Sequence, residues 1–580
     1  MFSLRSWILT AAAAVACGLW AAGERVAAQS SASKPAAAER RERLLQVDRE
    51  RWPAELVGQE LEGPLRAWMS WFADPKRTEA GLRELLDPGF SGTPPQLSGD
   101  VHWEPCGFAI EAGRTDLSPV ETDAFVESIQ AYVKGFGGID RTEHHVSRIG
   151  LETPDGATEA VGKAESAAAE IEVDIRLSAL GGESRREDQW TAVLNYARRG
   201  EGTGPGWLLR DCRIQAFTSL RGQAQFGAVE TPAGPGRPDP GENLYVAYFA
   251  EGLALGDIDG DGDLDVFQPR KGEAAALWEN DGAGNFTETA VARGLGGLEG
   301  VRAGYFFDQE NDGDVDLLVL TERRLFLFEN DGGRFTDVSE RSGFEKMSTG
   351  GLTGAAFGDY DRDGLLDFYV VNYGNPDEGP GFGYFDSRNG YFNKLFENRG
   401  GGVFADATDA AGLGADNRRW SYAAMFADVD ENGWPDLYVV NDYGPNQLFR
   451  NGGDGMFRDE AAERGAADFG NGMGVSWGDL DGDGRMDLYV SNMESYAGKR
   501  ITRAAGFPGD AEIKARAFRF AKGNTWLRGV GDGRFEEVEG SLIELGRWAW
   551  GNLLWDYDND GDLDVYVANG MFTNAGAADT

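Results

Sequence analysis

The chain has 580 residues, 83 of them glycine, and a formal net charge of −42 at pH 7. This length is sufficient for two or three domains with their own hydrophobic cores. The acidic excess argues against a nucleic-acid-binding protein, because phosphate binding requires a basic surface.

Residues 1–28 have the pattern of an export signal. Arg5 precedes an apolar run from Trp7 to Trp20, and small residues before Gln29 form a cleavage site. A lipoprotein site ending at Cys17 is the alternative, although the apolar run continues past it. No later segment is apolar enough to span a membrane. We therefore expect a secreted, periplasmic or cell-surface protein.

Residues 29–50 are predicted to form a tether or solvated helix, and residues 51–221 an α+β domain. Leu65, Trp68, Met69 and Phe72 share one helical face. A second helix is predicted to begin at the capping box of Ser118. Apolar residues then alternate with polar ones from residue 170 to 178, and further strands follow at 189–196 and 207–217. Helices followed by long antiparallel strands predict an α+β sandwich.

This order of elements resembles the NTF2-like cone fold, whose members include both enzymes and binding domains. The resemblance therefore implies no activity. His102, His144 and His145 are interpreted as structural or surface residues, and no catalytic residue is assigned. Cys106 and Cys212 remain after signal cleavage, and either form a disulfide in an oxidising compartment or are two small buried side chains.

A Pro- and Gly-rich linker at 222–242 precedes a repeat region at 243–580. Six copies of one loop begin at Asp257, Asp308, Asp359, Asp428, Asp479 and Asp556, at intervals of 51, 51, 69, 51 and 77 residues. Each copy has oxygen-bearing side chains at positions 1, 3, 5 and 9 and a glycine at position 6. Such loops favour Ca²⁺, which binds six to eight oxygens, with the seventh position contributing its backbone carbonyl.

Up to six structural calcium ions are therefore predicted. The predicted metal-binding positions are Asp257, Asp259, Asp261, Asp263 and Asp265; Asp308, Glu310, Asp312, Asp314 and Asp316; Asp359, Asp361, Asp363, Leu365 and Asp367; Asp428, Asp430, Asn432, Trp434 and Asp436; Asp479, Asp481, Asp483, Arg485 and Asp487; and Asp556, Asp558, Asp560, Asp562 and Asp564.

These loops differ from EF-hands. None has the glutamate that closes an EF-hand at position 12, and each is followed by a short β-branched and aromatic run. A solvated Asp/Gly turn would explain one copy, but six in register favour calcium loops in β-hairpins. Each repeat supplies four short strands, two around the loop and two around a Gly-rich turn such as Asn280-Asp-Gly. A period near 50 with four strands predicts a β-propeller of six or seven blades.

The repeats resemble FG-GAP/VCBS repeats, the units of integrin α-subunit propellers. Phe-Glu-Asn followed by Gly-x-Phe-x-Asp-Val, together with Asp-Tyr-Asp-x-Asp-Gly-x-x-Asp, resembles the cartilage acidic protein family and its bacterial relatives more closely. The resemblance covers about 335 residues and implies calcium ligands at the loop positions given above. Glu310 departs from the usual aspartate at position 3, and the family's Cys-containing C-terminal segment is absent.

The sixth repeat ends after its second strand, near Asn569. An unpaired blade edge invites aggregation. Either residues 225–230, which resemble a fourth strand, complete the last blade, or a seventh blade is missing.

The sequence predicts an exported calcium-binding module that binds an extracellular glycan or protein. The alternative is a secreted polysaccharide-cleaving enzyme, or an enzyme based on the NTF2-like domain with an accessory propeller. The oligomeric state is left open. A ligand site is predicted opposite the calcium loops, with the basic insertion 494–523 as its rim. Its residues are Arg418, Arg419, Trp420, Arg547 and Trp548, although these cations could instead neutralise nearby carboxylates and the tryptophans could pack between blades.

Overall fold

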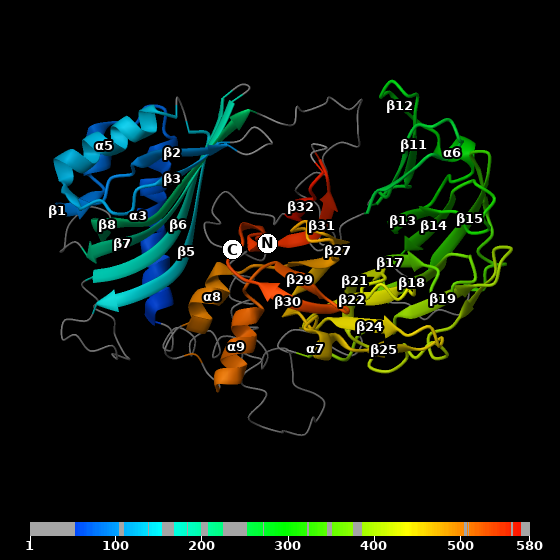
Figure 1. The fold of residues 1–580 in the computed structure, drawn as a ribbon. Helices are drawn as coiled ribbons and strands as arrows, with labels where there is room; N and C mark the ends of the chain where they lie inside the picture. The colour runs from blue at the N-terminus through cyan, green and yellow to red at the C-terminus, as the bar shows by residue number, and fades with distance from the viewer. Residues whose placement is uncertain are drawn as a thin grey trace, which may run out of the picture. The chain divides into compact units, whose positions relative to one another are not determined.

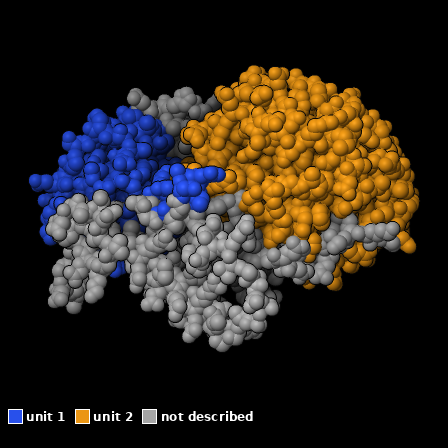
Figure 2. Space-filling model, turned by 90° about the horizontal axis from the view of Figure 1, so that it is seen from below, with its two compact units in different colours: residues 1–228, 495–514, 572–580 blue, residues 229–494, 515–571 orange. Residues whose placement is uncertain are grey.

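The structure is a computed structural model that forms two compact units (Figures 1 and 2). One unit contains the described residues up to 223 together with those of 495–514, and the other contains those of 252–494 and 515–569. The predicted signal peptide, the predicted tether, Cys106 and the segment 225–230 lie outside the described residues. The residues that the structure describes are 53–103, 109–136, 139–152, 168–181, 184–198, 207–223, 252–270, 272–321, 324–344, 351–374, 386–503, 507, 510–557 and 561–569.

The first unit is built on a largely antiparallel sheet of eight strands. Along the main path the order is β2-β3-β8-β7-β6-β5, while β1 pairs with β4 and, in parallel, with β8. Strands β6, β7 and β8 are the long alternating segments that the sequence predicts. The strands are β1 (Leu86–Gly92), β2 (Leu97–Trp103), β3 (Ala109–Gly113), β4 (Val120–Glu121), β5 (Arg141–Glu152), β6 (Ala168–Gly181), β7 (Ser184–Arg198) and β8 (Trp207–Gln223).

Helices α3 (Pro53–Ala73), α4 (Glu79–Arg83) and α5 (Thr122–Lys134) accompany this sheet (Figure 1). Apolar faces of α3 and α5 share one core with alternate residues of β6, including Trp68, Phe125 and Val173. The predicted start of the second helix is wrong. Its helix begins at Thr122, because Val120 and Glu121 pair with β1 as strand β4.

The core residues of this unit include Cys212, whose side chain is fully buried. Burial raises the pKa of this thiol. Because Cys106 lies outside the described residues, the Cys106–Cys212 disulfide stays a prediction. His102 and the two adjacent histidines lie on different strands, His102 on β2 and His144 and His145 on β5.

His144 predicts a pH dependence for the first unit. Burial, with the positive charge of Arg66, lowers the pKa of His144 to about 4. Because an unfolded histidine titrates near 6.5, stability is complete above that pH and is lost as the pH falls towards 4. We expect His144→Gln to reduce the loss of unfolding free energy between pH 7 and 4.5 by on the order of 2 kcal/mol. Calorimetry of the wild type and of His144→Gln at each pH measures the unfolding free energy. If this free energy falls equally with pH in both proteins, His144 is not the group responsible.

Part of the predicted basic rim belongs to the first unit. Helix α8 (Tyr496–Arg503) packs on β5 of that unit. Tyr496 stacks on His145 with ring centroids 4.4 Å apart, and Arg500 Nη1 donates to Val146 O at 2.6 Å. The role of residues 494–523 as the rim of a ligand site stays a prediction.

The second unit is mainly β, as predicted, and consists of consecutive antiparallel sheets, five of them four-stranded. In each, the strands follow one another in chain order, because short loops and hairpin turns join neighbours. The five sheets are β9 (Ala254–Gly256) to β12 (Phe286–Glu288), with β10 (Asp265–Gln268) and β11 (Ala276–Asn280); β13 (Val301–Phe307), β14 (Asp316–Thr321), β15 (Leu325–Asp331) and β16 (Arg334–Asp337); β17 (Leu352–Gly358), β18 (Asp367–Asn372), β19 (Lys394–Asn398) and β20 (Phe404–Asp406); β21 (Trp420–Ala427), β22 (Asp436–Asp442), β24 (Gln447–Asn451) and β25 (Phe457–Asp459); and β27 (Gly472–Gly478), β28 (Asp487–Asn492), β29 (Thr525–Gly531) and β30 (Arg534–Val538).

A sixth sheet contains only β31 (Ala549–Trp555) and β32 (Asp564–Asn569) among the described residues. The predicted end of the sixth repeat after its second strand stays a prediction, because residues 570–580 lie outside the described part of the chain. The remaining elements are short connections, except for α9 in the insertion. They are α6 (Ala290–Arg293), α7 (Ala461–Arg464), α9 (Ala511–Arg519), the 3₁₀ helix Leu542–Glu544 and the pair β23 (Gly444–Pro445) and β26 (Phe469–Gly470).

Apolar cores of the second unit lie between consecutive sheets. Leu277 of the first sheet and Leu317 of the second share one core, and Leu318 and Phe368 link the second and third sheets. Two further cores join the third sheet to the fourth and the fourth to the fifth. Each sheet is thus buried against the next. No helix within the described ranges is long and apolar enough to cross a membrane.

Candidate metal centre

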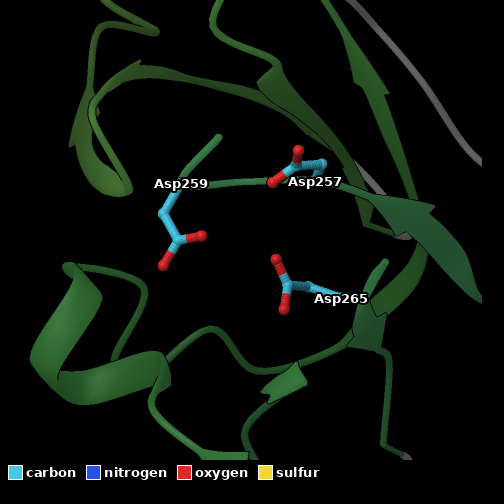
Figure 3. A group of neighbouring side chains, drawn as sticks. All are labelled: Asp257, Asp259 and Asp265. Atoms are coloured by element: carbon cyan, nitrogen blue, oxygen red, sulfur yellow. The ribbon is translucent and has the colours of Figure 1, made fainter. Parts of the chain in front are cut away.

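The six acidic loops connect the first and second strands of their sheets, as predicted. In four of them, one oxygen from each of the carboxylates at positions 1, 3 and 9 lies within 4.8 Å of the others. In the first loop, the carboxylates of Asp257, Asp259 and Asp265 point toward a common space (Figure 3). The other groups are Asp308, Glu310 and Asp316; Asp359, Asp361 and Asp367; Asp428, Asp430 and Asp436; and, at positions 1, 3 and 5, Asp479, Asp481 and Asp483.

The aspartate at position 1 shapes each loop by accepting backbone hydrogen bonds. Asp359 accepts from Asp363 N and Gly364 N, each at 3.0 Å. Asp479 makes the same two bonds, at 3.0 and 2.8 Å. These bonds wrap the backbone around the carboxylate and fix one oxygen-bearing side chain in place.

The aspartate at position 9 joins the loop to the third strand. Asp367 is fully buried and accepts from Tyr360 N at 3.1 Å and from Asn398 N at 2.8 Å. Asp265, Asp316, Asp436 and Asp487 are also buried and accept from the equivalent backbone groups. Each carboxylate oxygen has a second lone pair that could bind an ion.

Two positions of each of the first five loops adopt the left-handed backbone conformation. The glycine at position 6 has φ of 93° at Gly262 and 98° at Gly313, which explains why that position requires glycine. Position 4 is also left-handed, and there Asn311, Arg362 and Glu431 have φ of 59°, 60° and 58°. Sequence reasoning did not identify position 4, because its residues share no chemical property.

The clustered carboxylates are held in an unfavourable electrostatic environment. Burial, reinforced by Asp361 and Asp363, raises the pKa of Asp367 to about 7. Burial and the negative charge of Asp316 likewise raise the pKa of Glu310 to about 7. Glu310 Oε2 is buried and receives no hydrogen bond from the described residues. A cation would relieve this repulsion, and a set of oxygen donors alone fits Ca²⁺.

The last three loops differ from the first three. In the fourth, Arg450 forms ion pairs with Asp430 and Asp436, at positions 3 and 9. In the fifth, Arg485 pairs with Asp483, and Trp526 Nε1 donates to Asp487 at 3.2 Å. In the sixth, Asp556 accepts from Gly561 N at 3.0 Å, while residues 558–560 lie outside the described part of the chain.

Two of the predicted ligand-binding residues are buried and bonded within the unit. Arg419 is 4% exposed and pairs with Asp386 at 2.6 Å and Asp416 at 2.5 Å. Trp420 is 7% exposed, and its Nε1 donates to Asn389 Oδ1 at 2.8 Å. The ion pairs of Arg419 agree with the alternative that these cations neutralise nearby carboxylates.

The remaining predicted ligand-binding residues are partly accessible. Arg418 is half-buried over the Phe392 ring, and Arg547 is also half-buried. The Nε1 of Trp548 is buried without a hydrogen-bond partner among the described residues. Ligand binding by any of these residues stays a prediction.

Sequence reasoning missed an asparagine that links successive loops. Asn398 Nδ2, at the end of β19, donates to Gln309 O of the preceding loop at 2.8 Å and to Leu366 O of its own loop at 3.2 Å. Asn330 and Asn451 make the equivalent bonds in their repeats. The recurrence of asparagine after Leu-Trp-Glu, Leu-Phe-Glu or, in the fourth repeat, Leu-Phe-Arg was the available signal.

Comparison with known proteins identifies the repeats. A family model described as "FG-GAP-like repeat" matches residues 257–319, 308–370 and 428–490. Cartilage acidic protein 1 of Xenopus tropicalis is 25% identical over 55% of this chain and 57% of its own length. The Mus musculus protein is 25% identical over 61% of this chain and 62% of its own length.

This chain thus spans about 60% of the length of these curated relatives. A solved structure of a conserved protein from Planctomyces limnophilus DSM 3776 covers 27% of this chain and 94% of its own, at 13% identity and a TM-score of 0.17. That similarity is too low to inform the fold. The predicted resemblance to FG-GAP repeats and to the cartilage acidic protein family is confirmed: this chain carries FG-GAP-like repeats and is similar to cartilage acidic protein 1 over more than half of its length.

Proposed function

We propose that this protein is an exported, calcium-stabilised binding module for an extracellular glycan or protein. The observation that carries the proposal is the repeated convergence of three carboxylate oxygens within 4.8 Å in loops that join the first two strands of a sheet. An ion there would hold the two strands together and neutralise the loop. Its role is structural, because each group is embedded in the hairpin whose shape it determines.

The proposal includes closure of the sheets into a β-propeller of six or seven blades. Its support is that the first strands of successive sheets contact one another in turn, from β9 to β31. Apolar side chains at both ends of the series are 44–62% exposed, and a closed ring would cover them. They are Leu253, Leu255 and Leu264 in the first sheet, and Leu553, Trp555 and Tyr566 in the last.

An extracellular role is supported by the similarity to cartilage acidic protein 1 and by the predicted export signal of residues 1–28. The ligand site is proposed at the N-terminal ends of β21 and β31. These are the ends of the two strands that lie away from the acidic loops. Tyr422 and Trp550 lie near these strand ends, and their ring centroids are 6.3 Å apart. This distance supports the proximity of Arg418 and Arg547, which precede the two strands. Arginine beside tryptophan is common at binding hot spots.

Binding of an acidic polysaccharide tests this site. We expect immobilised heparin to bind the wild-type protein in calcium, and Arg418→Gln with Arg547→Gln to weaken binding at least about tenfold, through loss of two charged contacts. Surface plasmon resonance gives the affinities. Arg458→Gln is the matched control, because Arg458 is 55% exposed on another hairpin and pairs with Asp454.

Equal affinities for the wild type and the double variant would reject this site for acidic sugars. If heparin does not bind, the same variants should be compared on an array of neutral and acidic glycans. If the wild type and the double variant bind the same glycans equally well, the site is also rejected.

A further inference from the structure

In each of the five repeats whose third strand is described, that strand carries a charged residue opposite the aspartate of position 9. Leu437 pairs with Phe449 in β22 and β24, so the next pair along these strands is Asp436 and Arg450. By the same register, Glu279, Glu329 and Glu397 face Asp265, Asp316 and Asp367 in the first three repeats. The position is therefore acidic in the first three repeats and basic in the fourth and fifth. In the fifth, Arg528 faces Asp487 by the same register but pairs with Glu536 of β30.

In the first three repeats two carboxylates face each other across neighbouring strands. Like charges in directly opposite positions destabilise a sheet. The glutamates pair with Arg293, Arg341 and Arg399, and none of these pairs involves a position 9 aspartate. Arg293 also contacts Asp259, at 2.8 Å, but does not bridge two loop carboxylates. These loops keep a negative centre that suits a divalent cation.

In the fourth repeat the corresponding side chain lies among the loop carboxylates. Arg450 Nη2 pairs with Asp430 Oδ2, and Nη1 pairs with Asp436 Oδ2. The Arg450 side chain is 6% exposed and Asp436 is 0% exposed, so the ion pair is shielded from water. An arginine remains protonated in proteins, so it supplies a permanent positive charge at this point.

The rest of the fourth loop is also a weaker set of calcium ligands. Position 5 is Asn432, which brings no charge. Its Nδ2 donates to Asn451 O at 3.1 Å, and its Oδ1 accepts from Trp434 N at 2.8 Å. Three carboxylates therefore remain, and two of them are bound to one guanidinium. A calcium ion would have to displace this buried group.

We infer that the guanidinium of Arg450 replaces calcium in the fourth loop, so that this loop is held together by an internal cation and binds no ion. This inference rests on the proposed calcium binding by the other loops. It divides the repeats into loops that depend on calcium and one loop that does not. The fourth loop therefore keeps its structure when calcium is scarce.

Counting bound ions tests the inference. The probe is ⁴⁵Ca²⁺ in equilibrium dialysis against the full chain, compared with three variants. Asp430→Asn should leave the number of bound ions unchanged, because the fourth loop holds none. Asp361→Asn, the matched change in the third loop, should remove one ion. Arg450→Glu restores the acidic residue of the first three repeats and should add one ion.

The outcomes separate this inference from the proposed function. Loss of one ion in Asp430→Asn would show that the fourth loop binds calcium and would overturn the inference alone. A wild-type chain that binds no calcium would overturn the proposed function, and the inference with it. If Arg450→Glu does not fold, the Asp430→Asn and Asp361→Asn pair still decides between a calcium-free and a calcium-bound fourth loop.

Discussion

Removal of calcium with a chelator is expected to lower the melting temperature of the repeat unit by about 10 °C or more. A site that binds only in the folded state stabilises by about 2.7 kcal/mol when free calcium is 100 times its Kd. Each kcal/mol shifts the melting temperature of a domain of this size by roughly 2–4 °C. Three or more occupied loops therefore produce a large shift. Differential scanning calorimetry with and without EDTA gives the measurement.

The first unit provides an internal control, because none of the acidic loops lies in it. Its transition should stay in place when calcium is removed. Asp361→Asn should lower the calcium-dependent transition while leaving the melting temperature in EDTA unchanged, since asparagine still accepts the bond from Asp363 N. A repeat-unit transition that EDTA does not move would contradict calcium binding by the loops.

Replacement of Asn398 by alanine is expected to destabilise the repeat unit by about 2–4 kcal/mol. Asn398 is fully buried, and its side chain bonds Gln309 O and Leu366 O and accepts from Gly400 N at 2.9 Å. Alanine would leave three backbone groups without these partners. Urea unfolding in saturating calcium measures the change in free energy.

Asn398 also connects two loops, so its loss should weaken calcium binding at both the second and third sites. The exposed Asn285 of the first repeat is a matched control, because its side chain donates to Asp281 of the same hairpin at 2.8 Å and does not link two loops. Asn285→Ala should change the free energy of unfolding by less than about 0.5 kcal/mol. Equal effects of the two substitutions would show that the link between loops adds no stability.

The fifth repeat has no such link, because Gly529 stands where the asparagine would be. A Cβ at this glycine would lie 2.4 Å from Met486 O, so the backbone there leaves no room for a side chain. The fourth and fifth loops therefore lack the asparagine that joins each of the three earlier pairs of loops. Here the fourth and fifth sheets pack against each other through their shared apolar core.

The sequence alone determined the local features of the repeats. The spacing of aspartates and glycine predicted each loop, and the apolar run after it predicted the second strand, as at Asp367–Asn372. These features are readable because short loops, turns and side-chain alternation depend on residues that are neighbours in the chain.

Only the tertiary structure decided the contacts between distant residues. Asn398 bonds Gln309, 89 positions away, and Arg500 bonds Val146, 354 positions away. The second helix was predicted to begin at the capping box of Ser118, but pairing with β1 places Val120 and Glu121 in a strand. Arg450 reaches the fourth loop through the register of β22 and β24. Local sequence specifies which groups a segment offers, but folding decides which distant groups meet them, because burial makes every polar group require a partner.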